Sequence, residues 1–191
     1  MSIEPHPEFK RLLDACRKAS ARAWAGTVFR SATPRYATAS DLVSGAGART
    51  YGGRWNPPHA LAVVYASTTP ETALAEALRQ ARTAGIPDAA VLPRTFAALR
   101  VRVGRVLDLT DAAVRKVFGL SAAELVDADW ESDNAAGVEA LTQALGRAAF
   151  QAGFQALLVP SAAAPDGANL VVFPDRLSPR DELYALSAQR L

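Results

Sequence analysis

Four polar side chains lie where apolar, strand-like runs of the sequence end. They are Arg30 after "TVF", Tyr65 at the end of "LAVVY", Ser161 after "ALLVP" and Asn169 before "LVVF". An arginine can bind phosphate or carboxylate in a bidentate fork, and hydroxyl or amide groups can orient a ligand through hydrogen bonds. Binding groups often lie at strand ends that face one cleft. Strand ends are also generally polar, however, because they leave the apolar core. The four residues are therefore compatible with a site for an anionic ligand but do not establish one.

A fifth candidate, Glu76, lies on a helix that should follow Tyr65. Either Thr68 or Thr69 can cap this helix, and Pro70 suits its first position. The period of 3.6 residues gives the helix a polar stripe of Thr72, Glu76, Arg79 and Thr83, opposite an apolar face that includes Leu74, Ala77, Leu78 and Ala81. The stripe is either a solvated face with a Glu76–Arg79 pair or the wall of a cleft.

The turn "GGRWN" at residues 52–56 also has two interpretations. Its glycines make a tight turn, or they let the backbone at Gly53 approach a ligand closely. Arg54 could bind a phosphate or cover the indole ring of Trp55. His59, in the segment "PPHA" that follows, has no evident role.

Several common site patterns are missing. The sequence contains no P-loop, and "GAGART" lacks the third glycine and the preceding strand of a dinucleotide fingerprint. Ser161 does not lie in a G-x-S-x-G motif, so a hydrolase elbow is unsupported. With two histidines and one cysteine, we expect no metal site.

The composition is that of a globular protein of one domain. Of the 191 residues, 50% are hydrophobic and 21% are charged. The 21 Lys and Arg nearly balance the 19 Asp and Glu, which does not favour direct nucleic-acid binding. The single cysteine, Cys16, excludes an intrachain disulfide. We expect a cytoplasmic protein, because neither a signal peptide nor an apolar run of membrane-spanning length is evident.

The elements predicted from periodicity form an α+β domain. Helices are expected at residues 9–24, 70–83, 111–120 and 137–153, and strands at 26–32, 61–67, 155–161 and 168–174, with one or two more in 91–109. Residues 40–56 should form a turn-rich loop. Neighbouring antiparallel strands without regular βαβ alternation indicate a single compact domain with a mixed sheet and flanking helices.

The order of the motifs resembles the RES domain family, the toxin component of bacterial toxin–antitoxin systems. The resemblance rests on "FR" at residues 29–30, "GGRWN", "VVY" ending at Tyr65, and Glu76 eleven residues later. "TQALGRAAFQAG", "ALLVPSA" and "NLVVFP" then follow in the family's order. The resemblance implies an ADP-ribosyltransferase-like fold, in which residues 1–26 are an N-terminal helix of the same domain and residues 27–191 are the NAD-binding catalytic domain.

The resemblance also implies a function. Members of the family break the nicotinamide–ribose bond of NAD, so we expect a toxin-type enzyme that depletes NAD by phosphorolysis or hydrolysis. The alternatives are an ADP-ribosyltransferase acting on a cellular protein and a non-catalytic binding module. NAD would be a substrate rather than a permanently bound cofactor, with inorganic phosphate as co-substrate in the phosphorolytic case. The expected partner is an Xre-like helix-turn-helix antitoxin, with no nucleic acid or membrane bound directly.

The family's eponymous Arg, Glu and Ser correspond to Arg30, Glu76 and Ser161, and with Tyr65 they are the expected catalytic residues. Arg30, or as second choice Arg54, would bind the pyrophosphate. Glu76 would stabilise the positive charge that develops on the ribose, or would orient the attacking group by accepting from a ribose hydroxyl. Tyr65 would offer its ring to nicotinamide or its hydroxyl to ribose, and Ser161 would orient ribose or nicotinamide. The expected NAD-binding residues are Arg30, Gly53, Arg54, Tyr65, Ser161 and Asn169.

Overall fold

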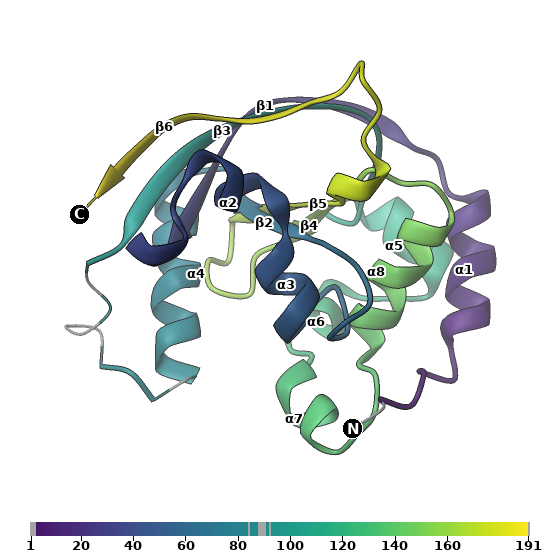
Figure 1. Cartoon of the computed structure of the whole chain (residues 1–191). Helices are drawn as coiled ribbons and strands as arrows, with labels where there is room; N and C mark the ends of the chain where they lie inside the picture. The colour runs from purple at the N-terminus through teal and green to yellow at the C-terminus, as the bar shows by residue number, and fades with distance from the viewer. Residues whose placement is uncertain (1–2, 84, 88–90, 92, 191) are drawn as a thin grey trace.

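Three strands form an arch across the molecule (Figure 1). The structure is a computed structural model that describes residues 3–83, 85–87, 91 and 93–190. β1 (Arg22–Ala32) and β3 (Thr95–Asp108) pair antiparallel, and β6 (Glu182–Arg190) pairs antiparallel with β3 as well. Buried and more exposed residues alternate along most of β3, because one face of this strand packs on the core.

Three short strands occupy the middle of the sheet. They are β2 (Val64–Ser67), β4 (Ala156–Pro160) and β5 (Ala168–Val172). The strand order is β1-β2-β5-β4-β3-β6, in which β3 and β4 are parallel and the other neighbours are antiparallel. This mixed sheet with flanking helices confirms the predicted α+β class.

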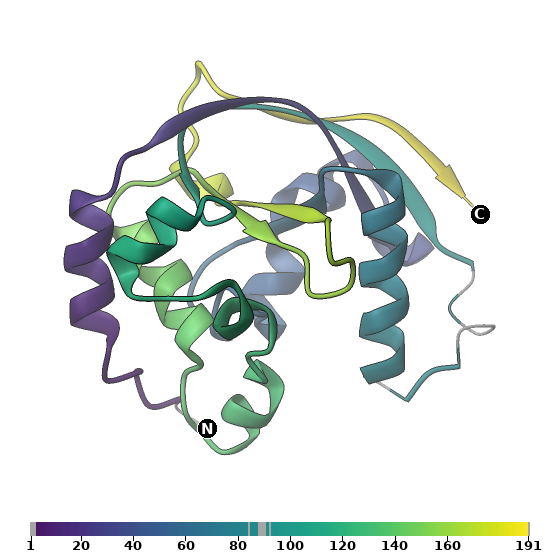
Figure 2. The ribbon, with the colours of Figure 1, turned by 180° about the vertical axis from the view of Figure 1, so that it is seen from behind.

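Helices flank the central strands on opposite sides (Figures 1 and 2). α1 (Phe9–Lys18) packs beside α8 (Leu141–Gln151), whereas α4 (Pro70–Thr83) stands on the other side. The shorter helices are η1 (Pro34–Tyr36), α2 (Ala39–Ser44), α3 (Ala46–Tyr51), α5 (Ala112–Phe118), α6 (Ala122–Val126), α7 (Trp130–Ala135) and η3 (Pro174–Arg176).

The central strands are buried on both faces, which explains their continuous apolar sequence. One face contributes Val63, Tyr65, Leu157, Val159, Val171 and Phe173 to a core shared with α1, α5 and α8. The other face contributes Val64, Ala66, Ala156, Leu158, Leu170 and Val172 to a core shared with β1 and β3. The prediction that the strand at 61–67 is buried on both faces is thereby confirmed, although the hydrogen-bonded strand β2 begins only at Val64.

Helix α4 has the predicted bounds, from Pro70 to Thr83. Of the two candidate caps, Thr69 accepts a hydrogen bond from the Thr72 backbone N–H at 3.2 Å. The predicted apolar face was wrong at Leu74, which is 44% exposed. The buried side consists instead of Thr72, Ala73, Ala77 and Ala81, because these small residues at helical spacing let the helix approach β1 and β2 closely.

The prediction of a turn-rich loop over residues 40–56 was wrong, since α2 and α3 fill most of it. Thr38 and Asp41 form a capping box that starts α2. Gly45 then adopts a left-handed conformation with φ 67°, which ends α2 and begins α3 within one residue. Each helix has six residues, too few for a periodic signal in the sequence.

Several other elements differ from expectation. The opening helix ends at Lys18 rather than continuing to Trp24, and β1 begins at Arg22, four residues before the predicted start. Long-range pairing with β3 extends β1 in this way, which local sequence does not report. β6, α6 and α7 were not predicted. The strand or strands predicted within 91–109 include residue 92, which lies outside the described residues. Over the described ranges, no helix is long and apolar enough to cross a bilayer.

Gly146 allows α8 to contact the "GGRWN" turn. A Cβ at this position would lie 1.9 Å from the Trp55 carbonyl oxygen. We therefore expect Gly146→Ala to lower the free energy of unfolding by about 1–3 kcal/mol or more, through overpacking, in a urea titration. The matched control is Gly47→Ala in α3, where an added Cβ meets no atom within 4 Å. It should leave stability unchanged or raise it by up to about 1 kcal/mol through helix propensity. Equal midpoints for the two variants would contradict the packing argument.

Candidate active site

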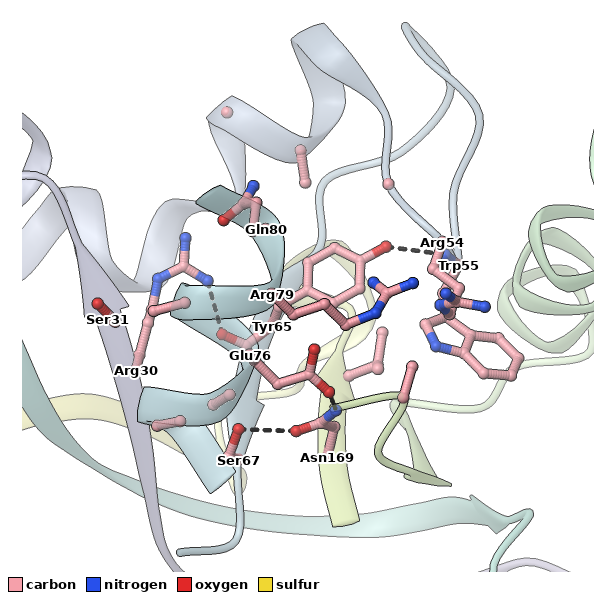
Figure 3. Close-up of a pocket in the computed structure, with 18 of the residues that line it drawn as sticks. Arg30, Ser31, Arg54, Trp55, Tyr65, Ser67, Glu76, Arg79, Gln80 and Asn169 are labelled. Carbon is pink, nitrogen blue, oxygen red and sulfur yellow. Dashed lines mark hydrogen bonds between the residues drawn. The ribbon is translucent and has the colours of Figure 1, made fainter. Parts of the chain in front are cut away.

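A cavity of about 440 Å³ opens between α4, the central strands and the "GGRWN" turn. Figure 3 shows that the polar side chains around it come from strands, helix and turn together. Its lining includes Arg30, Arg54, Glu76, Arg79 and Asn169. The volume lies in the ordinary range for small-molecule sites. The polar stripe of α4 is thus the wall of a cleft rather than only a solvated face.

The cavity lies where one face of the central strands changes from apolar to polar. Tyr65 and Val171 are opposite each other on β2 and β5, and the next positions on the same face are Ser67 and Asn169. Ser161 continues the corresponding row of β4, two residues after Val159. Because side chains alternate between faces with a period of two, the sheet register brings these polar groups together.

Glu76 is held by hydrogen bonds from Asn169 on β5, drawn in Figure 3, and from Ser161, the residue after β4. Its Oε1 atom accepts from Ser161 Oγ at 2.7 Å and from Asn169 Nδ2 at 2.6 Å. Asn169 Oδ1 in turn accepts from Ser67 Oγ at 2.7 Å. Oε2 has no hydrogen bond within the described part of the chain, so one carboxylate oxygen stays available to a ligand.

Ser161 lies behind Glu76 and is only 4% exposed. Its hydroxyl donates to Glu76 and accepts from the backbone N–H groups of Ala163 and Ala164, both at 3.1 Å. This geometry favours a role in orienting the carboxylate over direct contact with ribose or nicotinamide. Asn169 holds the same carboxylate and also borders the cavity.

Arg30 projects from β1 to the side of the cavity away from the turn (Figure 3). Its Nη1 donates to the Tyr65 carbonyl oxygen at 2.8 Å, and its buried Nε has no partner among the described residues. Burial lowers the pKa of Arg30, the charge of Arg94 lowers it further, and Tyr65 opposes both. A guanidinium with a buried, unpaired N–H is suited to an anion.

Tyr65 fixes the "GGRWN" turn with its hydroxyl. That hydroxyl donates to Asn56 Oδ1 at 2.8 Å and accepts from the Trp55 backbone N–H at 2.9 Å. A Cβ at Gly53 would lie 2.7 Å from the same hydroxyl, so the close approach that this glycine allows is to Tyr65. Burial raises the pKa of Tyr65. The hydroxyl is engaged in both directions, which leaves the ring for a ligand.

Arg54 and Arg79 lie on the turn side of the cavity (Figure 3). Arg54 Nη1 donates to the carbonyl oxygens of Leu125 and Ala128, at 3.1 and 2.9 Å. No ion pair joins Glu76 to Arg79 in the described structure, contrary to the solvated-face interpretation. The sequence placed Arg79 on the stripe, but only as an ion-pair partner of Glu76 and not as a ligand-binding residue.

The structure brings together the predicted residues Arg30, Gly53, Arg54, Tyr65, Glu76 and Asn169 around one cavity, with Ser161 immediately behind it. Sequence reasoning missed Ser67, which ends a buried strand, and Gln143, a buried amide whose Nε2 donates to the Gly53 carbonyl oxygen at 3.0 Å. A glutamine inside the apolar face of a helix was the available signal for Gln143. His59 has a left-handed φ of 63° in the segment after the turn.

Among the described residues, no group of three His, Cys, Asp or Glu side chains could hold a metal ion. The fixed positive charge of this cavity comes from its arginines.

Comparison with known proteins decides the family. The model of the RES domain matches residues 27–187. The chain belongs to the RES domain family. The RES relatives with curated names include the "NAD(+) phosphorylase MbcT" of Mycobacterium tuberculosis and of Mycobacterium bovis, each 33% identical to this chain over 134 residues. Those alignments cover 69% of this chain and 66% of the relatives, just under two thirds of their length.

Similarity to a solved structure covers nearly the whole chain. A chain of the Mycobacterium tuberculosis MbcT–MbcA toxin–antitoxin complex superposes with a TM-score of 0.76 and 27% sequence identity. The superposition covers 97% of this chain and 93% of that one. It confirms the ADP-ribosyltransferase-like α+β fold that the resemblance implied.

The role of the Tyr65 hydroxyl in stabilising the "GGRWN" turn of this RES domain can be tested by substitution. Tyr65→Phe leaves the Trp55 N–H without its acceptor and Asn56 Oδ1 without its donor. We expect a loss of about 1–3 kcal/mol in the free energy of unfolding, measured by urea titration, because buried polar groups become unsatisfied. Tyr36→Phe, at a side chain that is 57% exposed, is the control and should leave the midpoint unchanged. Equal stability of both variants would show that the Tyr65 hydroxyl does not support the turn.

Proposed function

We propose that this protein is a toxin-type NAD phosphorylase. The observation that carries the proposal is the Glu76 carboxylate, with Oε1 fixed by Ser161 and Asn169 and Oε2 left to the cavity. The similarity to the phosphorylase MbcT supports phosphate as the acceptor. NAD and inorganic phosphate are then the two substrates.

The reaction needs a group that stabilises positive charge on the ribose. An oxygen of the phosphate dianion bonds to the anomeric carbon while the bond from that carbon to the pyridine nitrogen breaks. The electron pair of the broken bond stays on the nitrogen, so neutral nicotinamide leaves and ADP-ribose 1''-phosphate forms, with one proton lost to solvent. The transition state resembles an oxocarbenium ion, as in glycoside hydrolysis. A preorganised carboxylate at Glu76 stabilises that charge without reorganising.

The other predicted residues take supporting roles. Arg30 binds the pyrophosphate through its unpaired buried N–H, and the Tyr65 ring packs against nicotinamide. Ser161 and Asn169 act through Glu76 by holding its carboxylate in one orientation. Gly53 and Arg54 form the wall on the turn side.

We further propose that an antitoxin protein neutralises the enzyme and that this antitoxin is of the Xre-like helix-turn-helix type. The solved complex of MbcT with MbcA supports a protein partner. The mouth of the cavity carries exposed residues, including Tyr51 at 78% exposure, that a partner could cover.

The primary test is nicotinamide release from NAD by the purified protein, with and without inorganic phosphate. Glu76→Gln keeps the shape of the side chain and removes its charge, so we expect kcat to fall by about 10²-fold or more. Chromatography of the products should show ADP-ribose 1''-phosphate. Free ADP-ribose would indicate hydrolysis instead, and ADP-ribose attached to protein would indicate a transferase.

Glu71→Gln is the matched control for this substitution. Glu71 lies in the exposed first turn of the same helix and outside the cavity. This variant should keep the kcat of the unsubstituted protein. Turnover by Glu76→Gln at a comparable rate would remove Glu76 from the mechanism.

Arg30→Ala tests the pyrophosphate site. We expect NAD affinity, measured by calorimetry without phosphate, to weaken by roughly 10- to 100-fold, since charge-assisted hydrogen bonds contribute about 1.5–3 kcal/mol. Thermal denaturation should accompany the titration, because the variant also frees the Tyr65 carbonyl oxygen. Unchanged affinity in a folded variant would count against this role for Arg30.

A further inference from the structure

The cavity has two cationic sides with Glu76 between them (Figure 3). Arg30 lies on one side, and Arg54 and Arg79 lie on the other. We infer that Arg54 and Arg79 form the subsite for inorganic phosphate, separate from the site that Arg30 provides for the NAD pyrophosphate. This inference rests on the proposed phosphorylase function and assigns its second substrate to named residues.

Arg54 is fixed in place but not neutralised. Its Nη1 donates to the carbonyl oxygens of Leu125 and Ala128, at the end of α6 and just beyond it. These neutral acceptors orient the guanidinium and leave its charge unpaired. Its Nη2 is buried and has no hydrogen-bond partner in the described part of the chain. Buried N–H groups are normally satisfied, so an unpaired one points to a bound acceptor that completes the site, such as an anionic oxygen.

Arg79 adds a second unpaired charge next to the first. It lies one helical turn beyond Glu76 on α4, and its side chain makes no hydrogen bond or ion pair with the described residues. Burial lowers the pKa of Arg54, the charge of Arg79 lowers it further, and Glu76 opposes the shift. The two guanidinium groups therefore repel each other, and an anion bound between them would relieve that repulsion.

The opposite side of the cavity has its own pair of arginines. Arg94 donates from Nε to Ser31 Oγ at 2.5 Å, and its charge lowers the pKa of Arg30. Phosphorolysis brings two separate anions to the ribose, the pyrophosphate of NAD and the attacking phosphate. Two arginine pairs with a carboxylate between them match that requirement, whereas hydrolysis requires only one anion site. Orthophosphate at Arg54 and Arg79 would lie across Glu76 from Arg30, on the side of the cavity that does not bind the pyrophosphate.

The test is the dependence of nicotinamide release on inorganic phosphate for Arg79→Gln at saturating NAD. We expect the KM for phosphate to rise at least 10-fold, while the Kd for NAD, measured by calorimetry without phosphate, stays within twofold. Free ADP-ribose should form a larger share of the product, because water replaces the weakly bound phosphate. Arg79→Lys keeps the charge but loses the bidentate fork, so its KM for phosphate should be intermediate.

Arg82→Gln is the matched control, because it removes the same charge from an exposed position of α4 outside the cavity. Its KM for phosphate should equal that of the unsubstituted protein. Circular dichroism verifies folding of each variant, and if Arg79→Gln is unfolded, Arg79→Lys decides the question alone.

The outcomes separate this inference from the proposed function. If the unsubstituted protein releases nicotinamide without any dependence on phosphate, the phosphorylase function is wrong and the subsite with it. If release depends on phosphate but a folded Arg79 variant keeps its KM for phosphate, the function stands and the subsite is wrong. If the Arg79 variant instead loses affinity for NAD with an unchanged KM for phosphate, Arg79 belongs to the pyrophosphate site, which also overturns the inference.

Discussion

Burial of the central strands on both faces is the constraint on which the site depends. β2, β4 and β5 have no free face, so each polar side chain near their ends needs a hydrogen-bond partner inside the protein. Ser67, Asn169 and Ser161 meet this need through one another and through Glu76 from α4. The same network that satisfies the buried polar groups also fixes the orientation of the carboxylate.

The charges of the cavity are held by neutral groups rather than by one another. Glu76 accepts from a hydroxyl and an amide, while Arg30 and Arg54 donate to backbone carbonyl oxygens. Among the described residues, none of these three forms an ion pair. Such an arrangement positions charge without cancelling it, as a site for a charged substrate requires. Unpaired, partly desolvated guanidinium groups cost stability in the empty protein, and a bound anion offsets that cost.

The turn "GGRWN" connects the core around α8 to the cavity. The Trp55 ring is buried with α8, whereas the backbone of the turn is anchored by the Tyr65 hydroxyl and the Gln143 amide. Glycine is needed at Gly53 because the Tyr65 hydroxyl leaves no room for a Cβ, and at Gly146 because the Trp55 carbonyl oxygen lies there. Packing within the protein therefore fixes the shape of the turn from which Arg54 projects.

The sequence by itself determined the elements whose signals are local. α4 begins and ends as predicted because a threonine cap, an N-terminal proline and a helical period all lie within its own residues. The central strands were evident from their apolar runs, and the ordered motifs identified the family that residues 27–187 match. Sequence also selected Arg30 and Asn169 because they lie next to apolar, strand-like runs, and Glu76 because it lies on the polar stripe of a predicted helix.

Only the tertiary structure decided what those candidates contact. Whether the polar stripe of α4 meets water or a cavity depends on how the helix is rotated against the sheet, and Ala73, Ala77 and Ala81 rather than Leu74 set that rotation. The pairing of Ser67 with Asn169, and of Asn169 with Glu76, depends on strand register between segments about 100 residues apart. These outcomes follow from long-range packing and pairing, which the local pattern of residues does not encode.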